Sequence, residues 1–312
     1  MTRTLVVVGI DCGTNSTRLL VADKDGRTIE RLLTITRLGR GVDSTGRLEE
    51  DAIDRTIRAL SKYRSVMDAY QVDSVRAVAT SASRDASNSV EFFTKAEKVL
   101  GVAPELLTGH QEGELSFLGA THGLGNDFGK CVVVDIGGGS TEIVAGSPGN
   151  SPGFALSIDM GCVRITEKYL QHDPPLDEEV ENATREIRDN IERVSTKARS
   201  AYYPEAFAGH RLIGVAGTVT AMSAIRLGLI DYQSAKIHHS ILTRDDIASL
   251  ASDLAGKTAF QRASEWHLET GRADVIVGGA LILKAISEHL VQDDVLVSET
   301  DILDGLVISQ LR

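Results

Sequence analysis

Two short segments carry the same residue types at the same spacing, and these residue types suit the binding of phosphate. Residues 11–17 read Asp-Cys-Gly-Thr-Asn-Ser-Thr, and residues 135–141 read Asp-Ile-Gly-Gly-Gly-Ser-Thr. They share an aspartate, a glycine, a serine and a threonine at matching positions: Asp11 and Asp135, Gly13 and Gly137, Ser16 and Ser140, Thr17 and Thr141. Loops of small residues present backbone N–H groups that bind oxyanions. The repeat therefore predicts two related subdomains, each with a phosphate-binding loop.

The loops also supply candidate ligands for a metal ion. Asp135 and Glu142 lie at opposite ends of the second loop, and Asp11 offers a third carboxylate from the first. Mg²⁺ usually takes one or two carboxylates together with phosphate oxygens and waters. Bracing of the loops by hydrogen bonds to backbone N–H groups remains the alternative for Asp11 and Asp135. Arg18 holds the position after the first loop that Glu142 holds after the second, so a basic residue stands in one copy where an acidic residue stands in the other. The backbone and hydroxyl donors that we expect to bind phosphate oxygens are Thr14, Asn15, Ser16, Gly137, Gly138, Gly139, Ser140 and Thr141.

Apolar runs precede and follow each loop, which predicts a loop between two strands of a hairpin. A dinucleotide-binding fingerprint would need G-x-G-x-x-G opening a helix, and Glu142 stands where its third glycine would be. The P-loop pattern G-x-x-x-x-G-K-[ST] is absent from the sequence. Two ordinary hairpin turns remain the simplest alternative, and the matched pair argues against them.

Composition excludes several classes of protein. The net charge of −11 disfavours a general electrostatic grip on nucleic acid, and an aromatic content of 4% disfavours a stacking platform for bases. No apolar run approaches the roughly 20 residues of a membrane helix, and the start of the chain lacks a signal-peptide pattern. We therefore expect a cytoplasmic protein with no membrane and no nucleic-acid partner. Three cysteines cannot all pair, which predicts reduced, buried thiols at Cys12, Cys131 and Cys162.

Strands alternate with helices along the chain, which predicts an α/β protein. Arg84 follows a predicted strand (75–80) in a polar loop (81–85), a position where open α/β sheets bind ligands, and its guanidinium suits a non-terminal phosphate. A surface pair with Asp85 is the alternative. Residues 216–220 look like a third loop of small residues, and the side chains of His238 and His239 are expected to diverge. The predicted helices cover 51–70, 88–100 (with a capping box from Asn88), a start near 111, 176–200, 273–290 and a start at 304.

Several segments together resemble the exopolyphosphatase and guanosine pentaphosphatase (Ppx/GppA) family of the sugar kinase, Hsp70 and actin superfamily. The chain looks like the short form, without the C-terminal HD-type region of longer members. The resemblance implies two ribonuclease-H-like domains, 1–124 and 125–312, with an active-site cleft between them and a final helix that can pack back on the first domain. The matching segments start at Asp11 (DCGTNSTRLL), Thr80 (TSASRDA), Thr108 (TGHQEGEL), Val134 (VDIGGGSTE), Asp159 (DMGCVR) and Gly271 (GRADVI).

The resemblance also assigns the chemistry. The catalytic segment of the family is usually Gly-x-Glu-Glu-Ala, and here residues 109–113 read Gly-His-Gln-Glu-Gly. The catalytic glutamate is thus retained as Glu112, while Gln111 and Gly113 replace the usual glutamate and alanine. The implied reaction is Mg²⁺-dependent removal of terminal phosphate from inorganic polyphosphate, with Glu112 positioning or activating a water molecule. Many members of the family are dimers, so a homodimer is compatible with the resemblance.

Three other functions stay open at this point. Guanosine pentaphosphate 5′-phosphohydrolase activity would use the same reaction centre. A phosphotransferase such as a sugar kinase would need a nucleotide pocket and a base for an acceptor hydroxyl, and Glu112 at a loop-to-helix junction favours water instead. A non-catalytic phosphate or alarmone sensor is suggested only by Gln111.

Overall fold

The computed structural model describes residues 5–198, 207 and 209–312. The chain divides into two units. Unit 1 comprises Met1–Gly119 and Asp301–Arg312, and unit 2 comprises Ala120–Thr300. The sequence placed the boundary after residue 124, and the final helix belongs to unit 1. No helix among the described residues is both long and apolar enough to cross a membrane.

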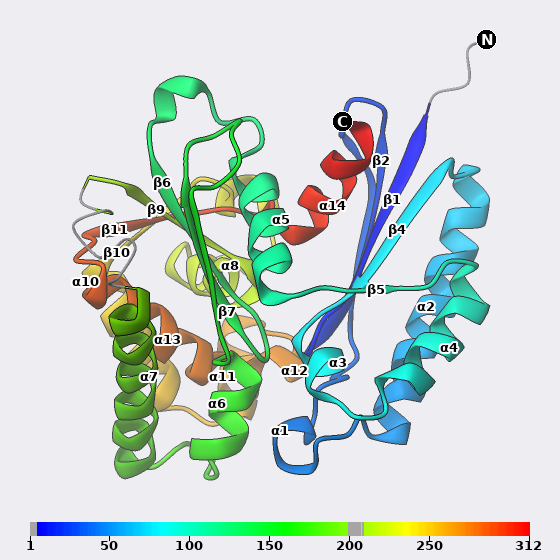
Figure 1. Ribbon diagram of the computed structural model, residues 1–312. Helices are drawn as coiled ribbons and strands as arrows, with labels where there is room; N and C mark the ends of the chain where they lie inside the picture. Colours follow the sequence, from blue (N-terminus) through cyan, green and yellow to red (C-terminus); the bar gives the residue numbers. More distant parts are fainter. Residues whose placement is uncertain (1–4, 199–206, 208) are drawn as a thin grey trace. The chain divides into compact units, whose positions relative to one another are not determined.

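Unit 1 is built on a sheet with the strand order β3-β2-β1-β4-β5 (Figure 1). Strand β2 runs antiparallel to both β1 and β3, whereas β4 pairs in parallel with β1 and with β5. Its strands are β1 (Val6–Cys12), β2 (Ser16–Asp23), β3 (Thr28–Ile35), β4 (Ser74–Ala79) and β5 (Glu105–Leu106). Its helices are α1 (Val42–Thr45), α2 (Glu50–Tyr70), α3 (Ser81–Asp85), α4 (Ser89–Leu100), α5 (Gly109–Thr121, which ends just inside unit 2) and α14 (Ile302–Leu311).

Unit 2 repeats this plan with the strand order β10-β11-β9-β6-β7-β8. Again three consecutive strands are antiparallel, and β9 and β11 continue the sheet in parallel. Its strands are β6 (Cys131–Ile136), β7 (Thr141–Gly146), β8 (Phe154–Ile158), β9 (Arg211–Val215), β10 (Ile241–Thr243) and β11 (Asp294–Val297). Its helices are η1 (Asn126–Phe128), α6 (Cys162–Tyr169), α7 (Asp177–Ala198), α8 (Ala216–Arg226), α9 (Ser234–Ile237), α10 (Arg244–Ala255), α11 (Ala259–Trp266), α12 (Thr270–Ala273) and α13 (Ile276–His289). The predicted α/β class with two ribonuclease-H-like sheets is confirmed.

Strand β1 buries both of its faces, which explains its apolar sequence. Val8, Ile10 and Cys12 belong to the core beneath α2 and α4, whereas Val7 belongs to a second core beneath α14. Alternate side chains of a strand point to opposite faces, so one strand serves both cores. Gly9 allows α14 to approach, because a Cβ at this position would lie 3.1 Å from Leu306 Cβ.

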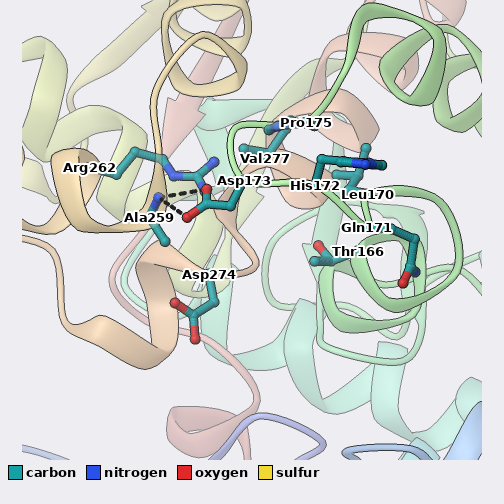
Figure 2. A pocket seen from close by; sticks show the side chains of 10 residues that line it. All are labelled: Thr166, Leu170, Gln171, His172, Asp173, Pro175, Ala259, Arg262, Asp274 and Val277. Atoms are coloured by element: carbon teal, nitrogen blue, oxygen red, sulfur yellow. Dashed lines mark hydrogen bonds and ion pairs between the residues drawn. The ribbon is translucent and has the colours of Figure 1, made fainter.

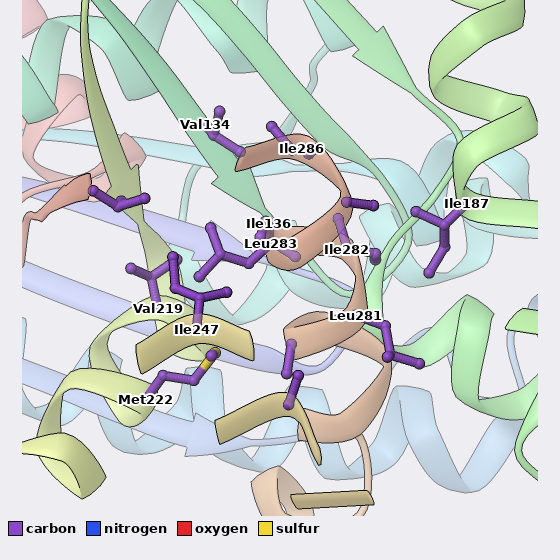
Figure 3. Close-up of a cluster of buried hydrophobic side chains, with 14 of the residues drawn as sticks. Val134, Ile136, Ile187, Val219, Met222, Ile247, Leu281, Ile282, Leu283 and Ile286 are labelled. Atoms are coloured by element: carbon purple, nitrogen blue, oxygen red, sulfur yellow. The ribbon is translucent and has the colours of Figure 1, made fainter. Parts of the chain in front are cut away.

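The core of unit 2 surrounds α13, which lacks a polar face over most of its length. Figure 3 shows Ile282, Leu283 and Ile286 of this helix beside Val134 and Ile136 of β6. These side chains are at most 2% exposed. A helix buried on nearly all sides is apolar all round, as the sequence of residues 276–283 is. The three cysteines are also buried and unpaired, as predicted.

Some predicted elements differ from the structure. Residues 81–85 form α3 and not a loop, and residues 216–220 begin α8 instead of a loop. The side chain of Asn88 makes no cap for α4, since it exchanges hydrogen bonds with the backbone of Leu48. The buried helix predicted over 273–290 is present as α13, and it begins three residues later than predicted, at Ile276. The predicted end of the 176–200 helix lies outside the described residues.

Candidate active site

The two phosphate loops have the same backbone conformation at their closing turn. The N–H of Gly13 donates to the carbonyl of Ser16 at 3.0 Å, and the N–H of Gly137 donates to the carbonyl of Ser140 at 3.0 Å. The loops join the antiparallel pairs β1–β2 and β6–β7. The predicted hairpins are therefore confirmed.

The first loop lies against the segment that follows β3. The N–H groups of Thr36 and Arg37 donate to the carbonyl of Asn15, and the N–H of Gly39 donates to the carbonyl of Thr14 at 2.9 Å. A Cβ at Gly39 would lie 2.3 Å from Thr14 Cγ2, so this contact requires glycine. Carbonyl and N–H of a trans peptide point in opposite directions. The contact thus turns the N–H groups of Asn15 and Ser16 away from residues 36–39.

The second loop lies against the start of α6 in the same manner. The carbonyls of Gly137 and Gly138 accept hydrogen bonds from the N–H groups of Cys162 and Val163, at 3.0 and 2.9 Å. The same peptide geometry directs the N–H groups of Gly138 and Gly139 away from α6. In both loops, the N–H groups next to the bonded carbonyls therefore point away from the supporting segment.

Two carboxylates face each other across the second hairpin. Asp135 of β6 is directly opposite Glu142 of β7, and their exposed fractions are only 6% and 1%. The hydroxyl of Ser157 on β8 donates to Glu142 Oε1 at 2.7 Å. Like charges directly opposite in a sheet are destabilising, and two buried carboxylates suit a hard divalent cation. The residues of this hairpin therefore fit the predicted Mg²⁺.

The corresponding position of the first hairpin holds an ion pair. Asp11 is opposite Arg18, whose Nε and Nη2 donate to Asp11 Oδ2 at 3.1 and 2.7 Å. Arg18 Nη1 also donates to Asp301, which caps α14. Burial raises the pKa of Asp11, and Arg18 opposes this rise. Asp11 Oδ1 is buried without a hydrogen-bond partner in the described part of the chain, so one oxygen of this carboxylate remains for a ligand.

Glu112 and Arg84 meet in unit 1. Glu112 lies in the first turn of α5, where it is 7% exposed. Arg84 comes from α3, and its Nη1 donates to the carbonyl of Leu107 at 2.9 Å and to Glu112 Oε2 at 3.3 Å. The sequence predicted these side chains for different roles, and the structure places them in one ion pair.

Most of the chain matches one known protein family. Residues 20–312 match the Ppx/GppA phosphatase family. The chain belongs to this family. The class of enzyme predicted from the sequence, a hydrolase, is confirmed at the level of the family.

Relatives in the Ppx/GppA family are similar over nearly the whole chain. Exopolyphosphatase 2 of Mycobacterium tuberculosis is 42% identical over 319 residues, which cover 97% of this chain and 98% of that protein. A crystal structure of the family member from Aquifex aeolicus has a TM-score of 0.81 at 32% identity, with 99% of this chain and 98% of that chain covered. An exopolyphosphatase from Cytophaga hutchinsonii shares the fold, with a TM-score of 0.86 at 23% identity and 98% and 97% coverage.

Gln111 departs from the usual Ppx/GppA segment, and the structure gives it a local role. Its Oε1 accepts hydrogen bonds from the N–H and the hydroxyl of Thr108, both at 2.9 Å, and the Thr108 hydroxyl accepts from the N–H of Gln111. This is the reciprocal pattern of a capping box at the start of a helix, which glutamine and glutamate both satisfy. Gln111 therefore fixes the first turn of α5, the turn that carries Glu112.

Some residues of the site were not predicted. Ser157 holds Glu142, Asp301 holds Arg18, and Ser81 lies 3.0 Å from the hydroxyl of Thr14. Each contact joins side chains of different elements, so the motifs by themselves did not signal it. The close approach of Gly39 to the first loop was also missed, although the glycine-rich stretch at 39–41 was a signal for it.

Two other features of unit 2 lie among residues with no predicted catalytic role. The rings of His238 and His239 stack with centroids 3.8 Å apart, whereas divergent side chains were expected; His239 adopts a left-handed φ of 65°, which breaks the regular alternation. A cavity of about 190 Å³ lies beside the ion pair of Arg262 and Asp173 (Figure 2). It is lined by Thr166, Leu170, Gln171, His172, Asp173, Pro175, Ala259, Arg262, Asp274 and Val277.

Proposed function

We propose that the chain is an exopolyphosphatase, which removes terminal orthophosphate from inorganic polyphosphate in the presence of Mg²⁺. The observation that carries the proposal is the second hairpin. There, a loop of glycine and hydroxyl residues borders two buried carboxylates, Asp135 and Glu142. The similarity to Exopolyphosphatase 2 of Mycobacterium tuberculosis supports the choice of substrate.

The proposed reaction is in-line attack of water on the terminal phosphorus atom. The bond from this phosphorus to the bridging oxygen breaks, orthophosphate is released, and the polyphosphate shortened by one phosphate leaves with the negative charge on its new terminal oxygen. Such a reaction needs a positioned water and stabilisation of negative charge that is spread over the phosphate oxygens. We assign the water to Glu112, whose carboxylate accepts a hydrogen bond from the water and takes up its proton as the new P–O bond forms. We assign the stabilisation of this negative charge to the hydrogen-bond donors of the two loops and to Arg84. The guanidinium of Arg84 keeps further N–H donors beyond the Nη1 that contacts Glu112.

Mg²⁺ would be held chiefly by Asp135 and Glu142. Bound there, the ion would supply Lewis-acid stabilisation of phosphate oxygens. Asp11 is the third proposed carboxylate, through its Oδ1, because its Oδ2 is engaged by Arg18. Ser157 would orient Glu142 through the hydrogen bond to Oε1.

The decisive experiment measures orthophosphate release with and without Mg²⁺ from long polyphosphate, tripolyphosphate, guanosine pentaphosphate and ATP. We expect polyphosphate to be the best substrate and Glu112→Gln to lower kcat by roughly 10²- to 10⁴-fold, the usual contribution of a general base. Glu114→Gln is the matched control, because Glu114 lies on the same helix with a side chain 45% exposed.

Two results would change the assignment. A preference for guanosine pentaphosphate would replace the substrate while keeping the reaction centre. Absence of release from all four compounds, with binding retained, would exclude the hydrolase and leave a phosphate sensor.

A further inference from the structure

The cavity beside Arg262 and Asp173 is formed by residues of unit 2, from α6, the segment after it, α11 and the start of α13 (Figure 2). Its volume is about 190 Å³. An apolar cavity of about 150 Å³ in another protein is large enough to bind benzene. The wall combines the two charged side chains with the apolar side chains of Leu170, Pro175 and Val277. Such a wall is typical of a site for a small molecule that has both polar and apolar parts.

Arg262 is a buried cation with an unsatisfied donor. Its side chain is only 3% exposed. Nη1 donates to the carbonyl of Leu254 at 3.2 Å, and Nη2 donates to Asp173 Oδ1 at 3.1 Å. Nε is buried and has no hydrogen-bond partner among the described residues. A buried charged donor without an acceptor is costly, and a carboxylate is among the strongest acceptors for a guanidinium. A ligand with a carboxylate in this cavity would remove the cost.

Asp173 holds this arginine and can still accept another hydrogen bond. Its Oδ1 accepts from Arg262 and, at 2.8 Å, from the N–H of Ala259, and its Oδ2 accepts from the same N–H at 3.0 Å. A carboxylate oxygen has two lone pairs, so Oδ2 can accept from a second donor. Asp173 lines the cavity and its side chain is 50% exposed, so a donor in the cavity can reach this oxygen.

The balance of charge selects the kind of ligand. Asp173 already compensates the charge of Arg262, so a simple anion or a simple cation would bring an uncompensated charge into the cavity. The net charge of −11 on the chain further disfavours an anion, and a cation would leave Nε of Arg262 without an acceptor. A free α-amino acid carries a carboxylate and an ammonium group on one carbon atom and is neutral overall. Its side chain would contact the apolar part of the wall.

We propose that this cavity binds a free α-amino acid with a branched apolar side chain. Its carboxylate accepts a hydrogen bond from Nε of Arg262, and its ammonium group donates to Oδ2 of Asp173. Valine, isoleucine and leucine are slightly larger than benzene, as the volume of the cavity allows. The inference is independent of the proposed phosphatase reaction, because that reaction uses neither Arg262 nor Asp173.

The test measures the binding of leucine to the full-length chain by isothermal titration calorimetry. We expect leucine to bind at one saturable site. Two analogues of leucine each lack one of its charges: 4-methylpentanoate has no ammonium group, and 3-methylbutylamine has no carboxylate. Each analogue should bind at least about 10-fold more weakly than leucine, because a hydrogen bond to a charged group usually contributes that much to affinity.

Variants of α11 locate the site. Ala259→Leu fills part of the cavity and keeps the backbone N–H that donates to Asp173, so we expect it to abolish the binding of leucine. Phe260→Leu is the matched control, because Phe260 is the next residue, is 80% exposed and lies outside the lining of the cavity. Its affinity for leucine should equal that of the wild type. Arg262→Met should also lose the binding of leucine; if this variant fails to fold, Ala259→Leu decides.

Three outcomes would overturn the inference. The first is the absence of a saturable heat of binding with leucine at millimolar concentration. The second is equal affinity for leucine and for one of its analogues, which would indicate a site for a simple anion or a simple cation. The third is unchanged affinity for leucine in a folded Ala259→Leu, which would place the bound leucine elsewhere on the chain.

Discussion

At the scale of single residues, three buried carboxylates of the site are held by partners from other elements. Glu142 is held by Ser157 of β8, Asp11 by Arg18 of β2, and Glu112 contacts Arg84 of α3. Removing such a supporting partner typically lowers metal affinity or activity by 10- to 100-fold. We therefore expect the loss of any of these partners to lower metal affinity or activity.

Ser157 provides a prediction at this scale. We expect Ser157→Ala to raise the Mg²⁺ concentration for half-maximal phosphate release by about 10-fold, because Glu142 loses an orienting hydrogen bond. The rate at saturating Mg²⁺ should change much less. Ser157→Thr keeps the hydroxyl and is the control. A Ser157→Ala variant with an unchanged Mg²⁺ titration would show that Glu142 needs no such support.

At the scale of elements, the start of α5 decides where Glu112 lies. Thr108 and Gln111 close the first turn of this helix through a reciprocal pair of hydrogen bonds. We expect Gln111→Glu, which restores the residue usual in the family, to retain stability and activity, because a carboxylate oxygen accepts the same bonds. Gln111→Ala should lose about 1 kcal/mol of stability and part of kcat, as loss of a cap does. Urea unfolding and phosphate release on both variants test this, and equal behaviour of the two would contradict it.

The crossing of α5 and α14 offers a second prediction for elements. A Cβ at Gly305 would lie 2.0 Å from the carbonyl oxygen of Leu115, and one at Gly119 would lie 1.8 Å from that of Asp301. Alanine normally favours a helix over glycine by about 1 kcal/mol, yet a backbone clash of this kind outweighs the gain.

We therefore expect Gly305→Ala to lower the free energy of unfolding by about 1–3 kcal/mol, the range usual for overpacking. Gly153→Ala is the control, since a Cβ there meets no atom within 4 Å. Equal midpoints in urea for Gly305→Ala and the wild type would mean that the two helices can separate without cost.

At the scale of the whole molecule, the strand order β3-β2-β1-β4-β5 of unit 1 recurs in unit 2 as β8-β7-β6-β9-β11. Each copy places its hairpin loop at the end of its first strand. The chain as a whole carries a net charge of −11, which disfavours a polyanionic substrate. For a polyanionic substrate to bind, cations at the site, either arginine side chains or metal ions, would have to offset the negative charge of the protein and of the substrate.

This balance predicts that substrate stabilises the chain only together with metal. We expect tripolyphosphate with Mg²⁺ to raise the thermal midpoint of Glu112→Gln by several degrees, since ligand at 100 times its Kd adds about 2.7 kcal/mol. Tripolyphosphate alone should have little effect. Adding Asp135→Asn to Glu112→Gln should abolish the part of the rise in thermal midpoint that depends on Mg²⁺. A midpoint that rises equally without Mg²⁺ would argue against a metal at Asp135 and Glu142.

The sequence by itself determined the two hairpin loops, the α/β class and the position of Glu112 at the start of a helix. Each of these depends on residues within a few positions of one another, so spacing and turn chemistry are sufficient. It did not reveal that residues 81–85 and 216–220 are helical, because small polar residues suit loops and helix starts alike.

Only the tertiary structure decided which polar and charged side chains contact each other. Arg18 and Asp301 are 283 residues apart, Arg84 and Glu112 are 28 apart, and Glu142 and Ser157 are 15 apart. Such pairs are set by sheet register and by the packing of α3 and α14, to which many residues along the chain contribute. A local sequence pattern does not signal such pairs. The contacts of Arg18 and Glu142, which hold equivalent positions in the two hairpins, were therefore known only from the tertiary structure.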